Sequence, residues 1–264
     1  MTVAALQAVE LLRAQPETHR AKEALDALRR GASASGIEMT STEEYQGSSP
    51  WLLIWGPGAP ARADVMRRHV AAGGRAIALD LAYWNRGVKA RVTVDAPHPQ
   101  ALVMARDLPA SRLAKDRPVM GQQWRQHGPV IVAGIGRKAK AQYGGAVDAW
   151  EDRMLAACRA RWSLRQVIYR PKPTVPVPDI SRELSGASLV VTWHSNIAVD
   201  AIALGIPAVC VDGAAAAVCP AELPEEVRPF DPALRDRFLA NLAWFQWAPS
   251  EARECWAFLR GLLG

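Results

Sequence analysis

The stretch Gly186 to Gly213, GASLVVTWHSNIAVDAIALGIPAVCVDG, is the most informative part of this 264-residue chain. A β-branched run, Leu189 to Thr192, is long enough for one buried strand, and an Ala-rich segment of helical length, Ile197 to Leu204, follows it. A Gly-x-Pro stop ends that helix, and a second strand-like run, Ala208 to Val211, completes the pattern. Strand, helix and strand form a βαβ unit, whose two parallel strands are buried on both faces.

The polar turn of this unit, His194-Ser195-Asn196, lies between the first strand and the helix. Such a turn stands at the carboxyl end of a strand and the amino end of a helix. In open α/β sheets, ligands bind in the crevice at that edge, and phosphates favour the free N–H groups of the helix end. We therefore predict that these three residues bind a phosphorylated ligand. Ser195 and Asn196 are also good N-cap residues, a structural role that is compatible with binding.

The composition is that of a globular protein, with half of its residues apolar and 22% charged. At 264 residues the chain can bury a sizeable core, and we expect it to form two domains. The net charge of +6 favours a polyanionic partner, either nucleic acid or a phosphorylated sugar donor. Solvated surface is the alternative interpretation for any one basic cluster.

Targeting and redox features predict a cytoplasmic protein. No basic stretch followed by an apolar core opens the sequence, so no secretory signal is expected. The apolar region 197–219 is interrupted by Asp200, Pro207 and Asp212, which argues against a membrane span. The four cysteines lack CxxC spacing, which predicts buried free thiols rather than a zinc site. They are Cys158, Cys210, Cys219 and Cys255.

Alternating apolar runs and helical patterns over roughly 35–105 indicate a first α/β unit. The expected strands are 51–55, 75–80 and 89–94. The expected helices are Val3 to Arg13, Glu17 to Arg30 and 64–72. The region 106–128 lacks apolar periodicity, and we take it as the connection between two domains.

A second α/β unit begins with the strand Val130 to Ala133 and continues through a helix over 146–162 and a strand over 166–169 to the βαβ unit. The tail, 232–263, is expected to form two helices whose tryptophans pack into the core. These are Trp244, Trp247 and Trp256. We therefore predict an α/β protein with two Rossmann-like domains, the N-terminal one reduced, and a C-terminal helical tail. The predicted domains are 1–120 and 121–264.

Two further turns follow strands of the second unit. Gly134-Ile135-Gly136-Arg137-Lys138 comes straight after a strand; its glycines let the backbone approach a phosphate, and its cations neutralise the charge. Arg170-Pro171-Lys172-Pro173 also follows a strand, and its prolines hold the two cations near the strand's carboxyl end. A tight turn and a rigid loop with surface charge are the alternative interpretations.

Gly186 to Gly213 resembles the carboxyl-terminal donor-binding domain of GT-B glycosyltransferases, especially the capsule-polysaccharide and related nucleotide-sugar-dependent enzymes. Asp200-Ala201 stands at their Glu-Ala position, and Gly205-Ile206-Pro207 matches their GxP. Arg170-Pro171-Lys172-Pro173 corresponds to an RxHP-like turn with lysine in place of histidine. Leu242 to Trp247 resembles an ending of phage-encoded glycosyltransferase-like proteins. The resemblance covers about 130–264.

The resemblance implies a nucleotide-sugar donor in the second domain, with a UDP-sugar favoured, and an acceptor in the first. It implies no cofactor and no metal, and no DxD motif occurs in the chain. The residues that it places around the donor are Gly134, Gly136, Arg137, Lys138, Arg170, Lys172, His194, Ser195, Asn196 and Asp200. Asp200 is one methylene shorter than the glutamate that in the family often contacts the ribose.

An inverting transfer needs a general base near the acceptor hydroxyl, at a strand end of the first domain. Asp80 closes the strand over 75–80 and is the first candidate; Asp95 and His98 follow the next strand. Asp80 has an alternative role in capping the turn or pairing with Arg86. A retaining enzyme needs no such base, and the sequence does not decide between the two.

The acceptor stays open among DNA carrying a hydroxymethylated base, a glycan and a lipid-linked sugar. Two other functions fit the same features: a non-catalytic nucleic-acid-binding accessory protein with a Rossmann-like core, and a sugar-nucleotide epimerase. The oligomeric state is not predicted.

Overall fold

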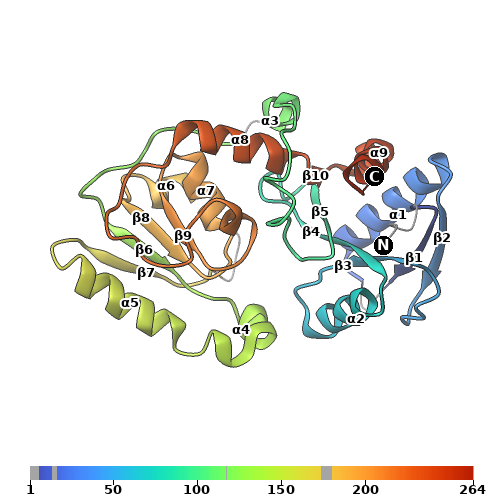
Figure 1. Ribbon diagram of the computed structural model, residues 1–264, viewed down its shortest axis with the longest axis horizontal. Coiled ribbons are helices and arrows are strands. Elements are labelled where there is room, and N and C mark those ends of the chain that lie inside the picture. The colour runs from blue at the N-terminus through green and yellow to red at the C-terminus, as the bar shows by residue number, and fades with distance from the viewer. Residues whose placement is uncertain (1–5, 14–16, 117, 174–179, 264) are drawn as a thin grey trace. The chain divides into compact units, whose positions relative to one another are not determined.

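The computed structural model describes residues 6–13, 17–116, 118–173 and 180–263. It consists of two compact units (Figure 1). The first combines Met1–Pro97 with Trp244–Gly264, and the second is His98–Ala243. Each unit has its own sheet of largely or wholly parallel strands, so the predicted α/β class is confirmed.

The sheet of the first unit has the strand order β10-β5-β4-β3-β1-β2. Its strands are β1 (Ala8–Leu12), β2 (Glu38–Thr42), β3 (Trp51–Trp55), β4 (Arg75–Leu81), β5 (Ala90–Val94) and β10 (Gln246–Trp247). Its helices are α1 (His19–Ala34), α2 (Pro60–Ala71), η3 (Pro249–Glu251) and α9 (Ala252–Leu263). In Figure 1, α1 and α9 lie on one side of the strands and α2 on the other.

The helix expected over Val3 to Arg13 is wrong where the structure describes it, because Ala8–Leu12 is strand β1. This strand pairs in parallel with β2 and β3, and Val9, Leu11 and Leu12 are buried. A short central strand buried on both faces has no alternation, so its apolar run is easily mistaken for one face of a helix. The first three residues of the expected helix lie outside the described residues.

Strand β5 runs antiparallel to β4, with Ile77 opposite Val94 and Leu81 opposite Ala90. The sequence predicted this strand but not its direction. No helix of the described chain separates β4 from β5, and a parallel connection needs a crossover of a dozen or more residues. The direction matters because β5 ends at the amino edge of the parallel strands.

The sheet of the second unit has four parallel strands in the order β7-β6-β8-β9. They are β6 (Val130–Ala133), β7 (Val167–Arg170), β8 (Leu189–Thr192) and β9 (Ala208–Cys210). The helices are α3 (Ser111–Asp116), α4 (Arg137–Tyr143), η1 (Gly144–Ala146), α5 (Trp150–Arg161), α6 (Ile180–Leu184), α7 (Ile197–Ala203), η2 (Ala214–Ala217) and α8 (Pro232–Ala243). In Figure 1, α5 covers one side of this sheet, and α6, α7 and α8 lie on the other.

A hydrophobic cluster holds α5 against its side of the sheet. Trp150 and Cys158 of α5 pack with Val132, Val191 and Val209 from three neighbouring strands, and all five are buried. Alternate residues of each strand point to opposite faces, so the remaining strand residues are buried on the face covered by α7. Burial on both faces gives the continuous apolar runs from which these strands were predicted.

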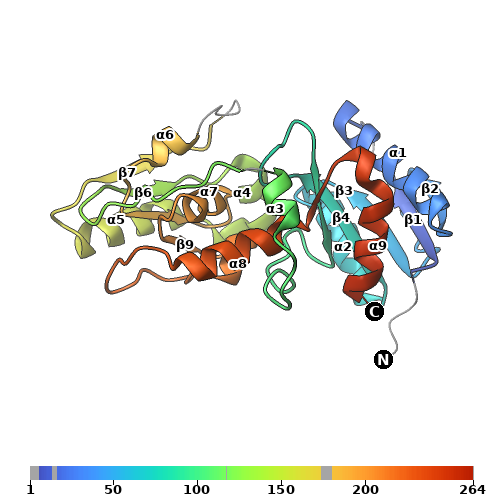
Figure 2. The same ribbon diagram turned by 90° about the horizontal axis from the view of Figure 1, so that it is seen from above.

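The units differ from the predicted boundaries of 1–120 and 121–264. The segment after Pro97 belongs to the second unit, where α3 contacts α8 and Leu108 N–H donates to Oδ1 of Asn241. The predicted tail is divided: its first helix, α8, belongs to the second unit, and from Trp244 on the chain belongs to the first unit, because β10 pairs with β5 and α9 packs along α1. Figures 1 and 2 both show α9 beside α1. The chain therefore returns to its first unit at the end.

The tail tryptophans pack as expected, although Trp247 lies in strand β10 rather than in a helix. Trp256 is fully buried, and its Nε1 donates to the carbonyl of Leu28 in α1 at 2.8 Å. Trp244 and Trp247 stack edge to face with ring centroids 6.1 Å apart. These contacts attach the end of the chain to the first unit.

The cysteines are free and buried, as predicted. Burial raises the pKa of the Cys158 thiol to about 11 and that of Cys219 to about 12. Both thiols are therefore protonated at neutral pH. Separately, no helix among the described residues combines the length and the apolar character that crossing a membrane requires.

Candidate functional site

The candidate site is the carboxyl edge of the second unit's sheet. From β6 the chain passes to β7 on one side, and it then returns to β8 on the other side of β6. The strand order therefore reverses between β6 and β8. In open α/β sheets, the loops that leave two such strands diverge and form a crevice that binds ligands. The loops here are Gly134 to Gly136 after β6 and Trp193 to Asn196 after β8.

The loop after β6 approaches the loop after β7 so closely that glycine is required. Gly134 N–H donates to the carbonyl of Arg170 at 2.8 Å. A Cβ at Gly134 would lie 2.7 Å from Oη of Tyr169 and 3.1 Å from the backbone nitrogen of Lys172. A Cβ at Gly136 would lie 3.3 Å from Cγ of Lys172. The structure thus brings Gly134, Gly136 and Lys172 together, as the sequence predicted.

Glu151 of α5 fixes this loop, a role that the sequence analysis missed. One carboxylate oxygen accepts hydrogen bonds from Ile135 N–H at 2.6 Å and Tyr169 Oη at 3.0 Å, and the other accepts from Lys140 Nζ at 2.6 Å. Burial opposes ionisation, but the bonds from Lys140, Ile135 and Tyr169 outweigh it and lower the pKa of Glu151. The carboxylate is therefore charged at neutral pH, and its bond to Ile135 N–H fixes the loop after β6.

The loop after β8 begins with a local turn. Thr192 Oγ1 accepts a hydrogen bond from Ser195 N–H at 3.1 Å, and Ser195 Oγ accepts one from Ile197 N–H at 3.4 Å. Asn196 occupies the N-cap position of α7, but its side chain makes no capping bond. The structural role proposed for Ser195 is present, whereas Asn196 does not cap through its side chain.

Asp212, two residues after the end of β9, joins the two halves of this edge. Its carboxylate accepts hydrogen bonds from Tyr143 Oη, from Gln100 Nε2 at 2.9 Å and from Gly213 N–H at 2.7 Å. Tyr143, the last residue of α4, also lies against the ring of His194, with centroids 5.6 Å apart. In the sequence, Asp212 stands out only as an interruption of an apolar run. Its place just after the fourth strand of this series was the available signal.

The predicted cations do not all remain available for a ligand. Arg137 and Lys138 are exposed in the first turn of α4, and within the described residues neither makes a hydrogen bond or ion pair. Lys172 is exposed beside Gly136. Arg170 forms an ion pair with Glu183 of α6, so its charge is already compensated. Asp200 is half-buried within α7.

Trp193 contributes a hydrogen-bond donor to the same edge. Its ring lies edge to face with Trp150, with centroids 5.8 Å apart, and also contacts Tyr143 at 5.9 Å. Its Nε1 is buried and has no acceptor among the described residues. Buried donors are nearly always paired, so this unpaired donor on the loop after β8 is an exception within the unit.

In the first unit, Asp80 lies at the carboxyl end of β4, as predicted. Its Oδ2 is 3.0 Å from Nη2 of Arg91, its neighbour across strand β5, and its Oδ1 accepts Leu81 N–H at 2.7 Å. The pairing partner is thus Arg91 and not Arg86, whose Nε donates to the carbonyl of Tyr83. Asp80 is therefore held in place by a cation.

The other two predicted catalytic residues lie elsewhere. Asp95 forms an ion pair with Arg75 and accepts Ala76 N–H at 2.7 Å, which places it at the amino edge of the sheet. It is therefore at the opposite edge from Asp80, because β5 is antiparallel. His98 is buried and belongs to the second unit. The three residues do not form one cluster.

The described residues contain no group of three or more His, Cys, Asp and Glu side chains that could hold a metal ion.

No family model and no curated protein matches the sequence. Among solved structures, the chain is similar to the Thermosulfurimonas dismutans KpsC beta Kdo 2,4 transferase, with 11% identity, a TM-score of 0.58 and 98% of both chains covered. It is also similar to the beta Kdo 2,7 transferase of KpsC from the same organism, with 12% identity, a TM-score of 0.55, and 96% and 99% of the two chains covered. The chain therefore shares the fold of these two structures over almost its whole length.

Proposed function

We propose that this chain is a metal-independent glycosyltransferase of GT-B-like architecture, which moves a sugar from a nucleotide-sugar donor to a hydroxyl acceptor. The observation that carries the proposal is the switch in strand order between β6 and β8, with glycines, exposed cations and polar side chains on the loops beside it. The almost full-length likeness to two Kdo transferases supports it. GT-B-like architecture would give the first unit the acceptor.

Each loop of the candidate site has a role in this proposal. The glycine loop lets the diphosphate of the donor approach the backbone, and Arg137, Lys138 and Lys172 neutralise its charge. Ser195, His194 and Asn196 bind the same phosphates or the ribose from the other side of the crevice. Asp200 faces the ribose. Arg170 acts indirectly, since its ion pair with Glu183 fixes the turn that carries Lys172.

The main catalytic effect would be stabilisation of the departing nucleotide by these preorganised positive groups. For an inverting transfer, Asp80 remains the proposed general base, since it is the candidate at the carboxyl edge of the first unit's sheet. Arg91 would keep it ionised and oriented before it accepts the proton of the acceptor hydroxyl. Asp95 is not suited to this role, because it lies at the amino edge.

A thermal-shift screen tests the donor site. The panel is UDP, GDP, CMP, their common sugars and the activated form of Kdo, with a UDP-sugar as the expected ligand. A nucleotide at a hundredfold excess over its dissociation constant stabilises the protein by about 2.7 kcal/mol, or roughly 5–10 °C for a chain of this size. If no nucleotide shifts the melting temperature at millimolar concentration, the proposal is wrong.

Two variants locate the binding event. Arg137→Ala combined with Lys138→Ala is expected to remove most of the shift, because it deletes two uncompensated charges at the phosphates. Arg159→Ala is the matched control, since Arg159 is exposed in the last turn of α5 and does not lie on a loop of the candidate site. Equal shifts in both proteins would place the nucleotide elsewhere.

The net charge of +6 also favours a second function, binding of nucleic acid without catalysis. Salt dependence separates the two, because phosphate contacts along a duplex release counterions and weaken by orders of magnitude between low and moderate salt. A nucleotide-sugar with two phosphates responds far less. DNA carrying a hydroxymethylated base is tested as a ligand in the salt series. It is also tested as an acceptor in a transfer assay, beside glycan and lipid-linked acceptors.

A further inference from the structure

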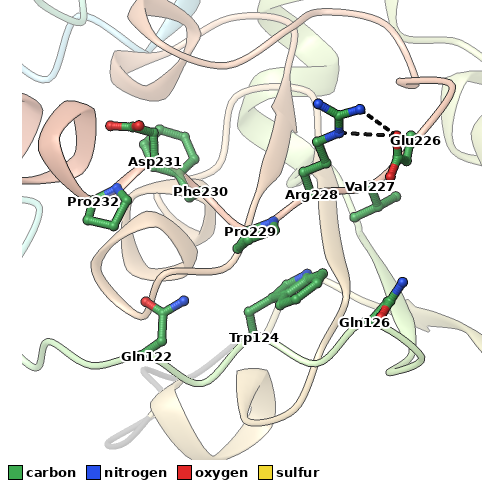
Figure 3. A pocket seen from close by; sticks show the side chains of 10 residues that line it. All are labelled: Gln122, Trp124, Gln126, Glu226, Val227, Arg228, Pro229, Phe230, Asp231 and Pro232. Carbon is green, nitrogen blue, oxygen red and sulfur yellow. Dashed lines mark hydrogen bonds and ion pairs between the residues drawn. The ribbon is translucent and has the colours of Figure 1, made fainter.

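A groove of about 530 Å³ lies in the second unit, away from the candidate site (Figure 3). One wall is the extended segment 122–126, which leads into β6, and the other is the segment 226–232, which leads into α8. Figure 3 shows Trp124 between them, projecting from the first wall toward the second. The groove is thus formed by two irregular segments held side by side.

The side chains of the first wall point alternately into and away from the groove, which determines the groups that line it. The N–H groups of Gly121, Gln123 and Arg125 donate to the carbonyls of Ala203, Leu204 and Ala187. In an extended segment the neighbouring residues point the other way, so Gln122, Trp124 and Gln126 share one side. All three line the groove. The sequence Gln-Gln-Trp-Arg-Gln therefore presents one aromatic ring flanked by two amides.

Trp124 is fixed with its polar atom directed into the protein. Its Nε1 donates to the carbonyl of Ser188 at 3.0 Å. The donor is satisfied, so what the half-buried ring offers the groove is its apolar surface. Gln122 is held as well, since its Oε1 accepts from Arg235 Nη1 at 3.5 Å. Its amide N–H₂ is left as the group for a ligand, and Gln126 is exposed.

The second wall adds charge that nearly cancels. Arg228 forms two hydrogen bonds to Oε2 of Glu226, at 2.8 and 3.1 Å, and the two side chains are 77% and 67% exposed. Asp231 caps α8 by accepting Leu234 N–H at 2.7 Å. The charged lining residues therefore sum to −1 in a chain whose net charge is +6. This excludes phosphates and nucleic acid as the preferred ligand.

The groove lies at the opposite edge of the sheet from the candidate site. Its first wall bonds to the last residues of α7 and to Ala187, just before β8, so it stands at the amino ends of the parallel strands. Nucleotide-binding loops occupy the carboxyl ends. A ligand here therefore makes no contact with the proposed donor residues of this unit.

We propose that this groove binds a neutral sugar ring of an oligosaccharide, at a site separate from transfer. A sugar has an apolar face of C–H groups, which would stack on Trp124, whose ring face is electron-rich. Its neighbouring hydroxyls suit planar side chains that offer paired donors and acceptors: Gln122 and Gln126 on one wall and the Glu226–Arg228 pair on the other. This inference goes beyond the proposed function and does not depend on it.

Saturation-transfer NMR and calorimetry on the full chain, without nucleotide, test the proposal. The probes are maltotriose, cellotriose and N-acetylchitotriose, with a proline decapeptide as the competing class, since aromatic grooves also bind proline-rich peptides. At least one trisaccharide is expected to bind, with the strongest saturation at ring C–H protons. If no trisaccharide binds, or the peptide alone binds, the proposal is overturned.

Variants assign the binding to the groove. Trp124→Ala is expected to weaken it by at least about tenfold, and Trp124→Phe to restore part of it. Gln126→Ala and Arg228→Ala change exposed side chains without endangering the fold, and each is expected to weaken binding by roughly threefold or more.

Gln166→Ala and Arg159→Ala are the matched controls, because they are exposed residues of the same types outside the groove. Binding that survives Trp124→Ala and Arg228→Ala would refute the site. Arg137→Ala with Lys138→Ala must leave sugar binding unchanged, which separates failure of this proposal from failure of the donor site.

Discussion

Tyr143 donates its hydroxyl hydrogen bond to Asp212, and this bond ties the end of α4 to the loop after β9. The same carboxylate accepts from Gln100 and Gly213. Since α4 begins directly after Gly136, one carboxylate connects the glycine loop's helix with the loops beyond the strand-order switch. The two sides of the candidate crevice are therefore mechanically linked within this unit.

Removing that carboxylate should destabilise the second unit. Asp212→Ala leaves Tyr143 and Gln100 without their acceptor, and we expect a loss of about 3 kcal/mol in the free energy of unfolding, against about 1 kcal/mol for Tyr143→Phe. Urea unfolding measures both. Asp152→Ala, which removes an exposed carboxylate of α5, should change stability by less than about 0.5 kcal/mol. An Asp212→Ala protein as stable as this control would contradict the link.

Gly134 and Gly145 give a matched test of the close approach between the loops after β6 and β7. Gly134→Ala places a Cβ 2.7 Å from Tyr169 Oη, so the loop after β6 must shift, and we expect nucleotide affinity to fall at least about tenfold. Gly145→Ala meets nothing closer than 3.9 Å and should leave affinity and melting temperature unchanged. Calorimetric titration with the nucleotide identified above compares them. Equal affinities would mean that the glycine loop does not contact the ligand.

The strands of the second unit could be predicted because burial on both faces leaves an unbroken apolar run between turn residues. Val130 to Ala133 and Leu189 to Thr192 were predicted with the bounds that the structure shows. The same property led to a wrong prediction at Ala8–Leu12, where four of the five residues are buried and one of these, Glu10, is charged. Only the tertiary contacts of Glu10 explain why a charge is tolerated there.

The positions of candidate residues could be predicted where they depend on strand ends alone. Gly134, Lys172 and Ser195 were proposed in this way, and the structure places them on the loops of one edge. That they bind a ligand stays a prediction. Glu151 and Asp212 were not found, because their roles depend on groups 11 to 112 residues away in sequence. The direction of β5, and with it the location of Asp95, also depends on pairing that no local pattern encodes.

Glu10 should make the first unit sensitive to acid. Its buried carboxylate accepts from the N–H groups of Gln46 and Ser48 at 2.7 and 2.8 Å, and from the hydroxyls of Ser48 and Thr42. Burial opposes ionisation, but these bonds outweigh it and lower the pKa of Glu10 below its ordinary value. The stabilisation is therefore complete above the unfolded pKa and is lost as pH falls through the folded one.

Glu10→Gln tests this dependence. At neutral pH we expect the free energy of unfolding to fall by about 2 kcal/mol. An amide oxygen is a weaker acceptor than a carboxylate, and the amide N–H₂ would face the N–H and hydroxyl donors that surround this position. The difference from the wild type should shrink below roughly pH 4. Thermal unfolding across pH measures it, and Glu38→Gln, an exposed change on β2, should show no such dependence. A difference that is constant with pH would show that the charge of Glu10 contributes nothing.

The tail should be needed for the stability of the first unit. Trp256 is fully buried between α9 and α1, and Trp256→Ala should cost about 3–5 kcal/mol through the cavity it leaves. Trp256→Phe keeps most of the volume but loses the bond to Leu28, so a smaller loss is expected. Hydrogen exchange should show reduced protection of the backbone amides of β1, β3 and α1 and unchanged protection of those of β6 and β8. Uniform loss across both sheets would contradict the division into two units.

The pairing of Asp80 with Arg91 allows its proposed catalytic role to be separated from its structural one. Asp80→Asn should abolish transfer while leaving nucleotide affinity intact, but it also leaves Arg91, 9% exposed, without its carboxylate, at a cost of roughly 2 kcal/mol. The double variant Asp80→Asn with Arg91→Met removes the unpaired charge and should recover most of that stability. If Asp80 is the base, the double variant stays inactive although it is stable. Recovery of turnover together with stability would instead make Asp80 a purely structural partner of Arg91, and the reaction would then need a base from elsewhere or none at all.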